Sequence, residues 1–501
     1  MAQSPLFAAI DLGSNSFHML VVRHIQGAIR VVAKLKRKVR LASGLDQNKF
    51  LDRESMERGW DCLKLFAEQL EDIPDENIRI VGTATLRYAN NAETFVRIAE
   101  EILGHKIEVI SGLEEARTIY QGVSWTSSGS GHRLVIDIGG ASTEVVLGEN
   151  FSAQILNSLP LGCVTWLNKY FDDGLLNETN FDNAIRGAKS LFMDIADEYK
   201  KVGWDSCVGA SGTVQALQEI MLAQGISERI TIEKLITLKS QSIACGSIDK
   251  LSLEGLLPER LTVFASGLSI LIALFESFNV KDMTLAGGAL REGLVYGMIS
   301  LATHNSQFGC IDAQERTVNS IIMRYQLDAE QGTRVQQTCE IIFEQLKNAW
   351  GMDERYFPIL ACAARLYELG LCIEYKKAPQ HAAYIVDNID MPGFTVAQRH
   401  LLSALLFNQK DDFKIDALKN QHAVSSAEAC CLARILRFAI ILCIRRTAGT
   451  VPKFKFSAAG EDLVLELPKG WMEEHYLRSS ELTREAQTQT NMGWNTIIRE
   501  L

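Results

Sequence analysis

The sequence carries one short pattern twice, and this repeat constrains the fold more than any other feature. Residues 7–10 are apolar and predict a strand, residues 11–16 (Asp-Leu-Gly-Ser-Asn-Ser) predict a polar turn, and residues 17–23 predict a returning strand. The same order returns at residues 134–147, with its polar turn at 137–142. A strand that turns directly into another strand differs from the strand-to-helix passage of dinucleotide-binding and Walker folds. The repeat therefore predicts two similar halves that face each other across a cleft.

Strand and helix patterns alternate around the repeat, which indicates an α/β fold. The further elements expected in the first half are a turn at 26–27, strands at 28–36, 78–81 and 107–110, and helices at 55–70 and 92–103. A Ser- and Gly-rich stretch at 124–132 marks a crossing between the halves. After residue 304 glycine becomes sparse, and the patterns predict helices at 311–350, 359–369 and 425–446, then a β pair at 454–456 and 463–467.

These patterns predict three domains, in line with the roughly three units expected for a chain of this length. Residues 1–124 and 125–305 would each form an α/β domain. Residues 306–501 would form a mainly helical domain with a short terminal β segment.

Composition limits the classes of function. The net charge of −10 argues against broad nucleic-acid binding, so an anionic substrate would have to meet a local basic site. The N-terminus lacks the pattern of a signal peptide, and no apolar run approaches the roughly 18 residues of a membrane span, so we expect a cytoplasmic protein without membrane contact. The most apolar stretches, 268–275 and 435–444, would be core helices. The 11 cysteines are scattered without a C-x-x-C pair, which predicts reduced thiols rather than a zinc site or disulfides.

One dense basic run lies in the predicted strand after the first turn. Its members are Lys34, Lys36, Arg37, Lys38 and Arg40. A strand would direct several of these side chains to one face, where they could meet an anion. The alternative is a solvated edge strand protected from aggregation by its charge.

The residue types of the two turns suit phosphate chemistry. Gly13 can take a positive φ, and its small polar neighbours leave backbone N–H groups uncovered, which favours an anion nest. The second turn adds a carboxylate at each end, Asp137 and Glu144. Because carboxylates beside a phosphate are unfavourable unless a cation bridges them, these two are candidate Mg²⁺ ligands. Either motif alone is compatible with a simple hairpin turn, whereas the matched pair favours function.

Four further motifs could complete a phosphate site. Residues 209–213 and Gly287-Gly288 each precede an expected helix, whose free N–H groups attract anions, although tight strand–helix packing explains such glycines equally well. Residues 82–87 end in Arg87 and could form a phosphate clamp or a surface loop. Glu114 and Glu115 begin a predicted helix, where the helix dipole alone would favour acids.

Taken together, these motifs resemble those of the exopolyphosphatase/guanosine pentaphosphate phosphohydrolase family. The segments that carry the resemblance are 11–16, 82–87, 112–117, 137–144, 209–213 and 287–293. It spans essentially the whole chain, and residues 8–22 with 36–45 look closer to the pentaphosphate phosphohydrolase branch. The family belongs to the actin-like, sugar-kinase and heat-shock ATPase superfamily, so the resemblance implies two actin-like (ribonuclease-H-like) α/β domains. It further implies that the helical C-terminal domain is of the HD-phosphohydrolase type.

The resemblance also assigns roles to residues. It implies Glu115 as catalytic base with Glu114 as its neighbour and Arg87 beside them, and Asp137 as Mg²⁺ ligand assisted by Glu144. The residues expected to bind substrate phosphates are Asp11, Gly13, Ser14, Asn15, Ser16, Thr83, Gly139, Gly140, Ala141, Ser142, Ser211, Gly212 and Thr213. Ala141 stands where the family usually has a third glycine, which is tolerable if its φ stays negative. In the C-terminal domain, Tyr367-Glu368 replaces the His-Asp pair of a metal-binding HD site. We therefore expect no second metal centre there, and only structural or substrate-cleft roles for His381 and His400.

The expected reaction is Mg²⁺-dependent hydrolysis of a terminal phosphoanhydride. The favoured substrate is guanosine pentaphosphate, converted to the tetraphosphate alarmone of the stringent response, with inorganic polyphosphate as runner-up or second substrate. A small-molecule kinase of the same superfold and a non-catalytic alarmone sensor are the more distant alternatives. No specific nucleic acid is expected as a partner. Long apolar helices in the C-terminal half make a homodimer reasonable.

Overall fold

The computed structural model describes residues 5–25, 28–303 and 312–501, so the turn expected at 26–27 lies outside the described residues. The chain divides into two compact units, Met1–Gln314 and Glu315–Leu501. Within the described residues, the first unit contains two mixed five-stranded sheets with helices, and the second is mainly helical. The predicted fold class is thereby confirmed.

The first sheet is built around the first copy of the repeat. Its strands are β1 (Leu6–Leu12), β2 (Ser16–Ile25), β3 (Ala28–Lys38), β4 (Ile78–Gly82) and β5 (Glu108–Val109), in the order β3-β2-β1-β4-β5. The strands β1 to β3 form the predicted antiparallel meander, and β4 joins β1 in parallel. The helices α1 (Arg53–Ala67), α2 (Ala84–Tyr88) and α3 (Ala92–Leu103) accompany this sheet. Asp52 caps α1 by accepting a hydrogen bond from the backbone N–H of Ser55.

The second sheet repeats the first strand by strand. Its strands are β6 (His132–Ile138), β7 (Thr143–Glu149), β8 (Ser152–Leu159), β9 (Ser206–Ala210) and β10 (Thr284–Leu285), in the order β8-β7-β6-β9-β10. Again three antiparallel strands are followed by parallel ones. The accompanying helices are α5 (Cys163–Tyr170), α6 (Glu178–Val202), α7 (Ser211–Ala223), α8 (Ile232–Cys245) and α9 (Leu261–Phe278). The short sequence match thus marks a duplicated topology.

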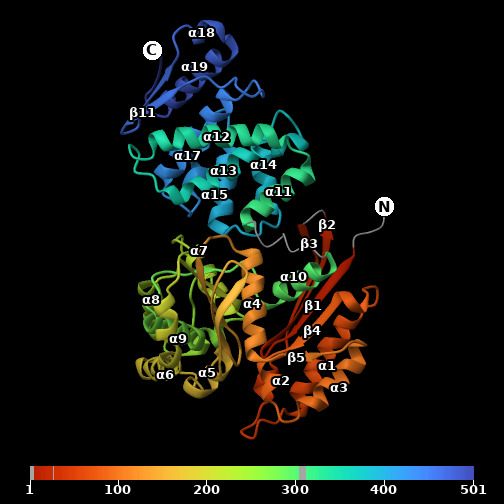
Figure 1. Cartoon of the computed structure of the whole chain (residues 1–501). Helices are drawn as coiled ribbons and strands as arrows, with labels where there is room; N and C mark the ends of the chain where they lie inside the picture. Colours follow the sequence, from red (N-terminus) through yellow and green to blue (C-terminus); the bar gives the residue numbers. More distant parts are fainter. Residues whose placement is uncertain (1–4, 26–27, 304–311) are drawn as a thin grey trace. The chain divides into compact units, whose positions relative to one another are not determined.

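Two helices, α4 (Gly112–Thr126) and α10 (Leu290–Thr303), lie between the two sheets (Figure 1). One apolar cluster joins them to both sheets, because it includes Val22 of the first sheet, Val135 of the second, Ile119 of α4 and Leu294 of α10. The two helices approach closely at Gly122, where an added Cβ would collide with the backbone of Ala289 and Gly293. Gly122 thus allows the two helices to pack backbone against backbone.

The apolar stretch at 268–275 belongs to a longer helix than the sequence suggested. With 18 residues and a mean hydropathy of 1.9, α9 is long and apolar enough to cross a membrane, which corrects the expectation that no run reaches that length. In the structure 78% of it is buried inside the protein, as a core helix is. Its side chains pack with those of α6 in the core of the second half.

The second unit is a helical bundle followed by a small sheet. Its helices are α11 (Ala313–Tyr325, which begins in the first unit), α12 (Ala329–Leu346), α13 (Phe357–Leu366), α14 (Ala378–Asn388), α15 (Val396–Phe407), α16 (Ile415–Lys419), α17 (Ser426–Leu442), α18 (Trp471–Glu474) and α19 (Tyr476–Asn491). The single pattern at 311–350 is two helices, broken near Gln326, whose φ is 53°. The predicted β pair is confirmed as β11 (Lys455–Ala459) and β12 (Asp462–Leu467).

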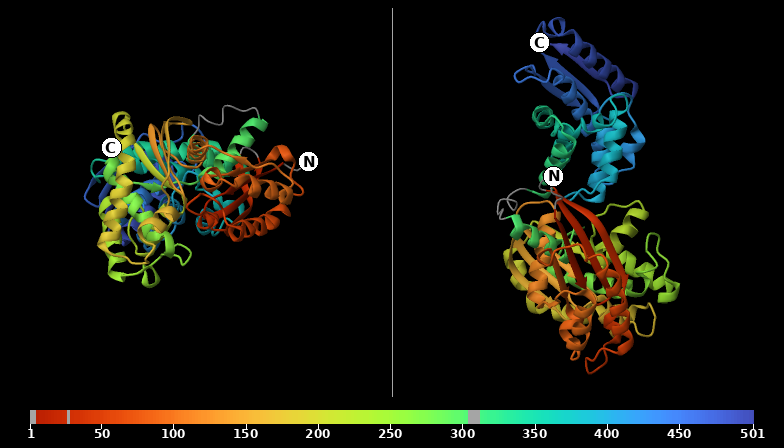
Figure 2. Two further views of the ribbon diagram at one scale, coloured as in Figure 1. Left: turned by 90° about the horizontal axis from the view of Figure 1, so that it is seen from below. Right: turned by 90° about the vertical axis from the view of Figure 1, so that its right-hand side faces the viewer.

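A third strand, β13 (Thr496–Glu500), was not predicted and pairs with β12 in parallel. Figure 2 shows this sheet beside α19 at one end of the unit. A buried ion pair connects α19 to α17, with Arg437 Nη2 donating to Glu485 Oε2 at 2.6 Å. The charge that interrupts the apolar run at 435–444 is therefore neutralised inside the core.

Candidate active site

The two polar turns are matched four-residue hairpin loops that meet each other. Leu12 pairs with Phe17 across the first loop, and Ile138 pairs with Thr143 across the second. A Cβ added to Gly140 would lie only 2.9 Å from the Cβ of Ser14, so the second loop packs directly on the first. Residues far apart in the sequence are thus brought to one place by the repeated topology.

In these loops glycine is needed because a side chain would not fit, and not because the backbone is left-handed. Gly13 was expected to take a positive φ, but it is not among the described residues that do. Instead, an added Cβ on Gly13 would lie 2.9 Å from the carbonyl oxygen of Ser16. This corrects the physical basis of the anion-nest prediction. Ala141 likewise has no positive φ, so its methyl group causes no backbone strain.

The loops open into a cleft of about 470 Å³ in the first unit. Besides the loops, it is lined by the start of α4, the start of α7 and the residues that lead into α10. The residues expected to bind phosphate that line it are Asp11, Gly13, Ser14, Asn15, Ser16, Thr83, Gly139, Gly140, Ser142, Ser211, Gly212 and Thr213. Ala141 does not line it.

Glu115 enters the cleft from the first turn of α4 and is held by Arg87. Ser111 caps this helix by accepting a hydrogen bond from the N–H of Glu114, which places Glu115 on the inner face with an exposed fraction of 7%. Arg87 Nη1 donates to Glu115 Oε2 at 2.9 Å and to the carbonyl of Ile110 at 2.9 Å. Burial raises the pKa of Glu115 to about 7, against the opposing effect of Arg87. A carboxyl group with this pKa can accept a proton near neutral pH.

The neighbouring Glu114 has a different environment. It forms an exposed ion pair with Arg117 at 3.1 Å and does not line the cleft. Of the two acids that begin the helix, the structure brings only Glu115 to the candidate site.

Arg87 has a second N–H group that faces no acceptor. Arg87 lies on α2, whose N-cap residue is Thr83. Residues 82–87 therefore form a buried strand end and a short helix rather than a surface loop. The Nη2 of Arg87 is buried and has no hydrogen-bond partner among the described residues. Arg87 itself does not line the cleft, whereas Glu115, to which it donates, does. An unsatisfied buried donor next to the candidate base is suited to a phosphoryl oxygen.

Asp137 and Glu144 are both buried at the second loop, where they pair across the hairpin. Burial raises the pKa of Asp137 to about 6, although a hydrogen bond with Ser211 opposes the shift. Burial, followed by the charges of Glu115 and Asp137, raises the pKa of Glu144 well above its usual range. Ser158 Oγ donates to Glu144 Oε1 at 2.8 Å. The positive charge of Arg291 also opposes the shift at Asp137, but neither carboxylate forms an ion pair with a described residue.

Asp11 adds a further carboxyl group to the same cleft. Burial raises its pKa to about 7, and the charges of Glu115 and Asp137 contribute, while Arg291 opposes them. Its Oδ1 is buried without a hydrogen-bond partner among the described residues. Four acids thus converge on the loops, and a divalent cation fits this donor set. In the described part of the chain, no three His, Cys, Asp or Glu side chains are close enough to hold a metal together, but Mg²⁺ commonly takes one or two carboxylates plus substrate oxygens and water.

The first residues of α7, which begins directly after β9, also line the cleft. Ser211 has a positive φ of 64°, which is strained for a serine and typical of functional positions, and its Oγ donates to the carbonyl of Ile138 at 2.8 Å. The guanidinium of Arg260 lies so close to Gly212 that any Cβ there would collide with it. Because Gly212 has no side chain, the positively charged guanidinium of Arg260 can lie directly against this part of the cleft.

The sequence motifs do not identify every residue of the cleft, and His18, Arg260 and Arg291 are among those that they leave out. Arg291 follows Gly287-Gly288 at the start of α10, so the glycine pair was the available signal, whereas Arg260 has no glycine motif beside it. His18 lies on β2 opposite Asp11. Burial lowers its pKa to about 2, and the charges of Arg291 and Lys36 add to the effect.

The basic run is divided by the alternation of β3. Lys34 and Lys36 line the cleft, and Lys36 Nζ also contacts Glu259 Oε1 at 3.1 Å. Lys38 Nζ donates to the carbonyl of Glu259 at 3.1 Å. The alternating lysines therefore share one face, as the strand prediction required.

Comparison with known proteins agrees with this geometry. A model of the Ppx/GppA phosphatase family matches residues 20–302, and the model of domain III of the same phosphatases matches residues 313–486. The chain belongs to the Ppx/GppA phosphatase family.

Relatives within the Ppx/GppA family match over the full chain. The guanosine-5'-triphosphate,3'-diphosphate pyrophosphatase of Aeromonas hydrophila subsp. hydrophila is 62% identical over 501 residues, which is 100% of both chains. The protein of that name from Aliivibrio fischeri (strain MJ11) is 53% identical over 99% of this chain and 98% of its own.

Solved structures resemble part of this chain in fold. An exopolyphosphatase from Cytophaga hutchinsonii has a TM-score of 0.54 at 21% identity and covers 59% of this chain and 98% of its own. The Aquifex aeolicus family member has a TM-score of 0.51 at 21% identity, covering 60% and 99%.

Proposed function

We propose that this phosphatase hydrolyses the terminal 5′-phosphate of guanosine pentaphosphate, releasing phosphate and guanosine tetraphosphate. The observation that carries the proposal is Glu115, a buried carboxylate in the cleft of about 470 Å³, beside an arginine with an unsatisfied N–H group. The full-length relatives named as guanosine-5'-triphosphate,3'-diphosphate pyrophosphatases support this choice of substrate.

Glu115 acts as the general base in this mechanism. Water attacks the terminal phosphorus in line, and its proton passes to the carboxylate of Glu115. The bond between the terminal phosphorus and the bridging oxygen breaks, and the nucleotide leaves with that oxygen. Arg87 neutralises charge on the phosphoryl oxygens through Nη2, because Nη1 is already engaged by Glu115 and Ile110.

Asp137 and Glu144 are the proposed Mg²⁺ ligands. Both carboxyl groups have raised pKa values, and neither forms an ion pair with a described residue. These features fit the binding of a metal cation between them. Bound Mg²⁺ supplies charge neutralisation for the phosphate oxygens. The loop residues Ser14, Asn15 and Ser142 would bind the remaining oxygens together with backbone N–H groups.

Arg260, Arg291, Lys34 and Lys36 add positive charge to the lining of the cleft, which suits a substrate with several phosphates. The same lining favours inorganic polyphosphate as a second candidate substrate. Purified protein with Mg²⁺ should release one phosphate per guanosine pentaphosphate, with kcat/KM higher than for polyphosphate. Failure to release phosphate from either would support the sensor alternative, and transfer to a small acceptor would support the kinase alternative.

We also propose that the enzyme works in the cytoplasm as a homodimer. Exposed apolar side chains in the second unit, such as Leu371, Ile373 and Tyr375, are available for subunit contact. Light scattering after size-exclusion chromatography tests this, because a mass near 55.7 kDa would contradict a dimer.

A further inference from the structure

An ion pair joins the two halves of the first unit beside the cleft. Lys36 belongs to β3 of the first half, and Glu259 belongs to the second half, where it lies shortly before α9. Lys36 Nζ lies 3.1 Å from Glu259 Oε1. Lys38 Nζ donates to the backbone carbonyl of Glu259, also at 3.1 Å. Two lysines of one strand thus hold the segment before α9 against the first sheet.

Only one partner of this ion pair lines the cleft. Lys36 is among the lining residues, as is Arg260, whereas Glu259 is not. The carboxylate of Glu259 therefore lies at the edge of a positively charged lining and is not placed to act as a base or a metal ligand. An anionic substrate that reaches Lys36 has to displace this carboxylate from the ammonium group.

The strand register shows which anions reach Lys36. Asp11 pairs with His18, and His18 pairs with Lys36, so the three side chains form a row across neighbouring strands, and all three line the cleft. Two strand spacings separate the backbone of Lys36 from that of Asp11 by roughly 10 Å. A chain of phosphates that begins at the first loop and follows this row meets Lys36, whereas a single phosphate at the loop does not need it.

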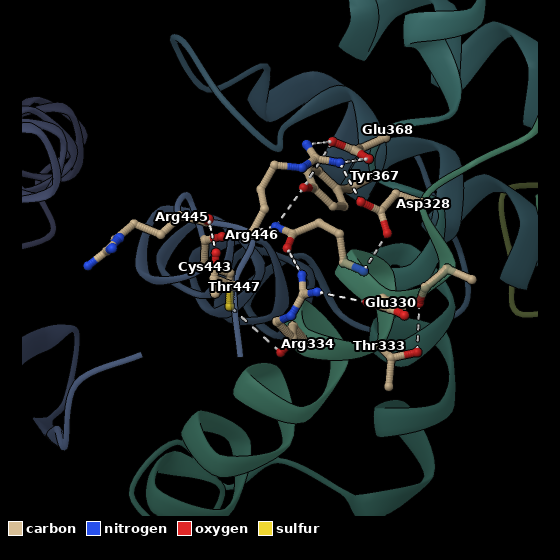
Figure 3. Close-up of polar contacts among 12 residues, drawn as sticks. Asp328, Glu330, Thr333, Arg334, Tyr367, Glu368, Cys443, Arg445, Arg446 and Thr447 are labelled. Atoms are coloured by element: carbon tan, nitrogen blue, oxygen red, sulfur yellow. Dashed lines mark hydrogen bonds and ion pairs between the residues drawn. The ribbon is translucent and has the colours of Figure 1, made fainter. Parts of the chain in front are cut away.

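The geometry of the ion pair allows it to exchange. One nitrogen of Lys36 contacts one oxygen of Glu259, and their side chains are 38% and 53% exposed. Figure 3 shows a pair of the opposite kind in the second unit, where Arg446 contacts both oxygens of Glu368, whose side chain is only 11% exposed. An exposed single contact stabilises a protein little, so a phosphate oxygen can replace the Glu259 carboxylate readily.

We propose that Glu259 is a specificity-determining residue that competes with the substrate for Lys36, and so weakens the binding of phosphate chains but not of a single phosphate. The inference rests on the proposed function, because it takes the cleft as the place where the substrate phosphates bind. On binding, Lys36 Nζ moves from Glu259 Oε1 to a phosphate oxygen, and the carboxylate returns to water. The hydrogen bond from Lys36 lowers the pKa of Glu259, so the competing group is an anion at neutral pH.

Glu259→Gln in the full-length chain tests the proposal, because it removes the charge and leaves the backbone carbonyl that Lys38 binds. The probe is a tripolyphosphate analogue with methylene groups in place of the bridging oxygens, which the enzyme cannot hydrolyse. In equilibrium dialysis the variant should bind it about three- to fivefold more tightly than wild type, as expected for an exposed pair. The gain should shrink as ionic strength rises, and the affinity for orthophosphate should not change.

Two further variants identify the cause of the gain. Glu254→Gln is the matched control, because Glu254 is an exposed acid of the same segment that does not line the cleft. It removes the same charge and should leave the affinity for the analogue unchanged. In a Lys36→Gln background, Glu259→Gln should no longer tighten binding, because the cation for which it competes is absent.

Four results would overturn the proposal: equal affinity of Glu259→Gln and wild type for the analogue, equal gains in Glu259→Gln and Glu254→Gln, an undiminished gain in the Lys36→Gln background, and an equal gain for orthophosphate. With guanosine pentaphosphate, Glu259→Gln should lower KM and leave kcat at the wild-type value. If neither protein released phosphate from it, the proposed hydrolysis would be wrong, whereas the binding of the analogue would still decide the role of Glu259.

Discussion

Arg87 and Glu115 form the ion pair on which the candidate chemistry depends, with Nη1 and Oε2 2.9 Å apart and both side chains largely buried. The arginine arrives from α2 and the glutamate from α4, on either side of the strand end at Gly82. The pair holds the carboxylate still, opposes the rise in its pKa and leaves one guanidinium N–H group free.

Replacement of Glu115 by Gln should abolish most turnover while the protein still folds. The amide keeps the size of the side chain but cannot accept the proton of water, so kcat should fall by roughly 10²–10⁴-fold. Glu114→Gln is the matched control, because Glu114 is exposed and should affect kcat less than about twofold. Phosphate release measured under single-turnover conditions would decide, and near-normal turnover by a folded Glu115→Gln protein would remove Glu115 as the base.

Replacement of Arg87 by Ala should change the pH profile as well as the rate. Arg87 opposes the increase in the pKa of Glu115, so its removal should raise that pKa above about 7. The acid limb of kcat/KM should then move to higher pH, because the base must be deprotonated. The rate at its optimum should also fall about 10²-fold from the loss of the phosphate contact. A lower rate with an unchanged acid limb would mean that Arg87 does not act on the base.

Asp11 should destabilise the metal-free protein as pH rises. Its pKa is about 7 when folded, against 3.8 as the ordinary value, so the folded state holds a proton that the unfolded state releases. The contribution of this carboxyl group to stability is fully present below pH 3.8 and is lost as pH rises through 7. Asp11→Asn should therefore be more stable than wild type at pH 8 without divalent cations, by on the order of 1–4 kcal/mol.

The same variant should show little advantage near pH 4, where the wild-type carboxyl group is protonated. Thermal unfolding at both pH values checks the prediction. A pH-independent difference between Asp11→Asn and wild type would show that steric effects, not the titration, cause it. Phosphate release should decrease in the variant, because the carboxyl group of Asp11 lowers stability but contributes an oxygen ligand that activity needs.

The sequence predicts the loops of the site well because local chemistry determines them. The two polar turns, the strands around them and the helix start at Glu115 depend on residues close in the chain, and the duplicated pattern indicated the duplicated sheet. His18, Arg260 and Arg291 could not be found this way, since only the packing of separate elements brings them to the cleft. Likewise β13 is a short strand that depends on its partner β12. The φ of Gly13 was inferred from residue type, whereas the actual constraint is the nearby carbonyl of Ser16.

Ala141→Gly tests how closely the second loop depends on the missing glycine. Because Ala141 has no positive φ and does not line the cleft, its methyl group should not block phosphate. Activity should stay within about twofold, and stability should fall by about 0.5–1 kcal/mol because glycine gains more freedom in the unfolded chain. Steady-state kinetics and denaturant unfolding check both parts. An activity gain of tenfold or more would show that Ala141 restrains the loop.

The buried pair Arg437–Glu485 should dominate the stability of the C-terminal helices. Arg437 also donates to the carbonyls of Asn408 and Asp411, so one guanidinium connects α17, α19 and the loop after α15. Glu485→Ala leaves that cation buried without its acid and should cost about 3–5 kcal/mol. The double variant Arg437→Met/Glu485→Met removes both charges and should cost less than Glu485→Ala alone, as measured by thermal unfolding. An equal or larger loss in the double variant would mean that the hydrogen bonds of Arg437 to the backbone, rather than its charge balance with Glu485, stabilise this part of the fold.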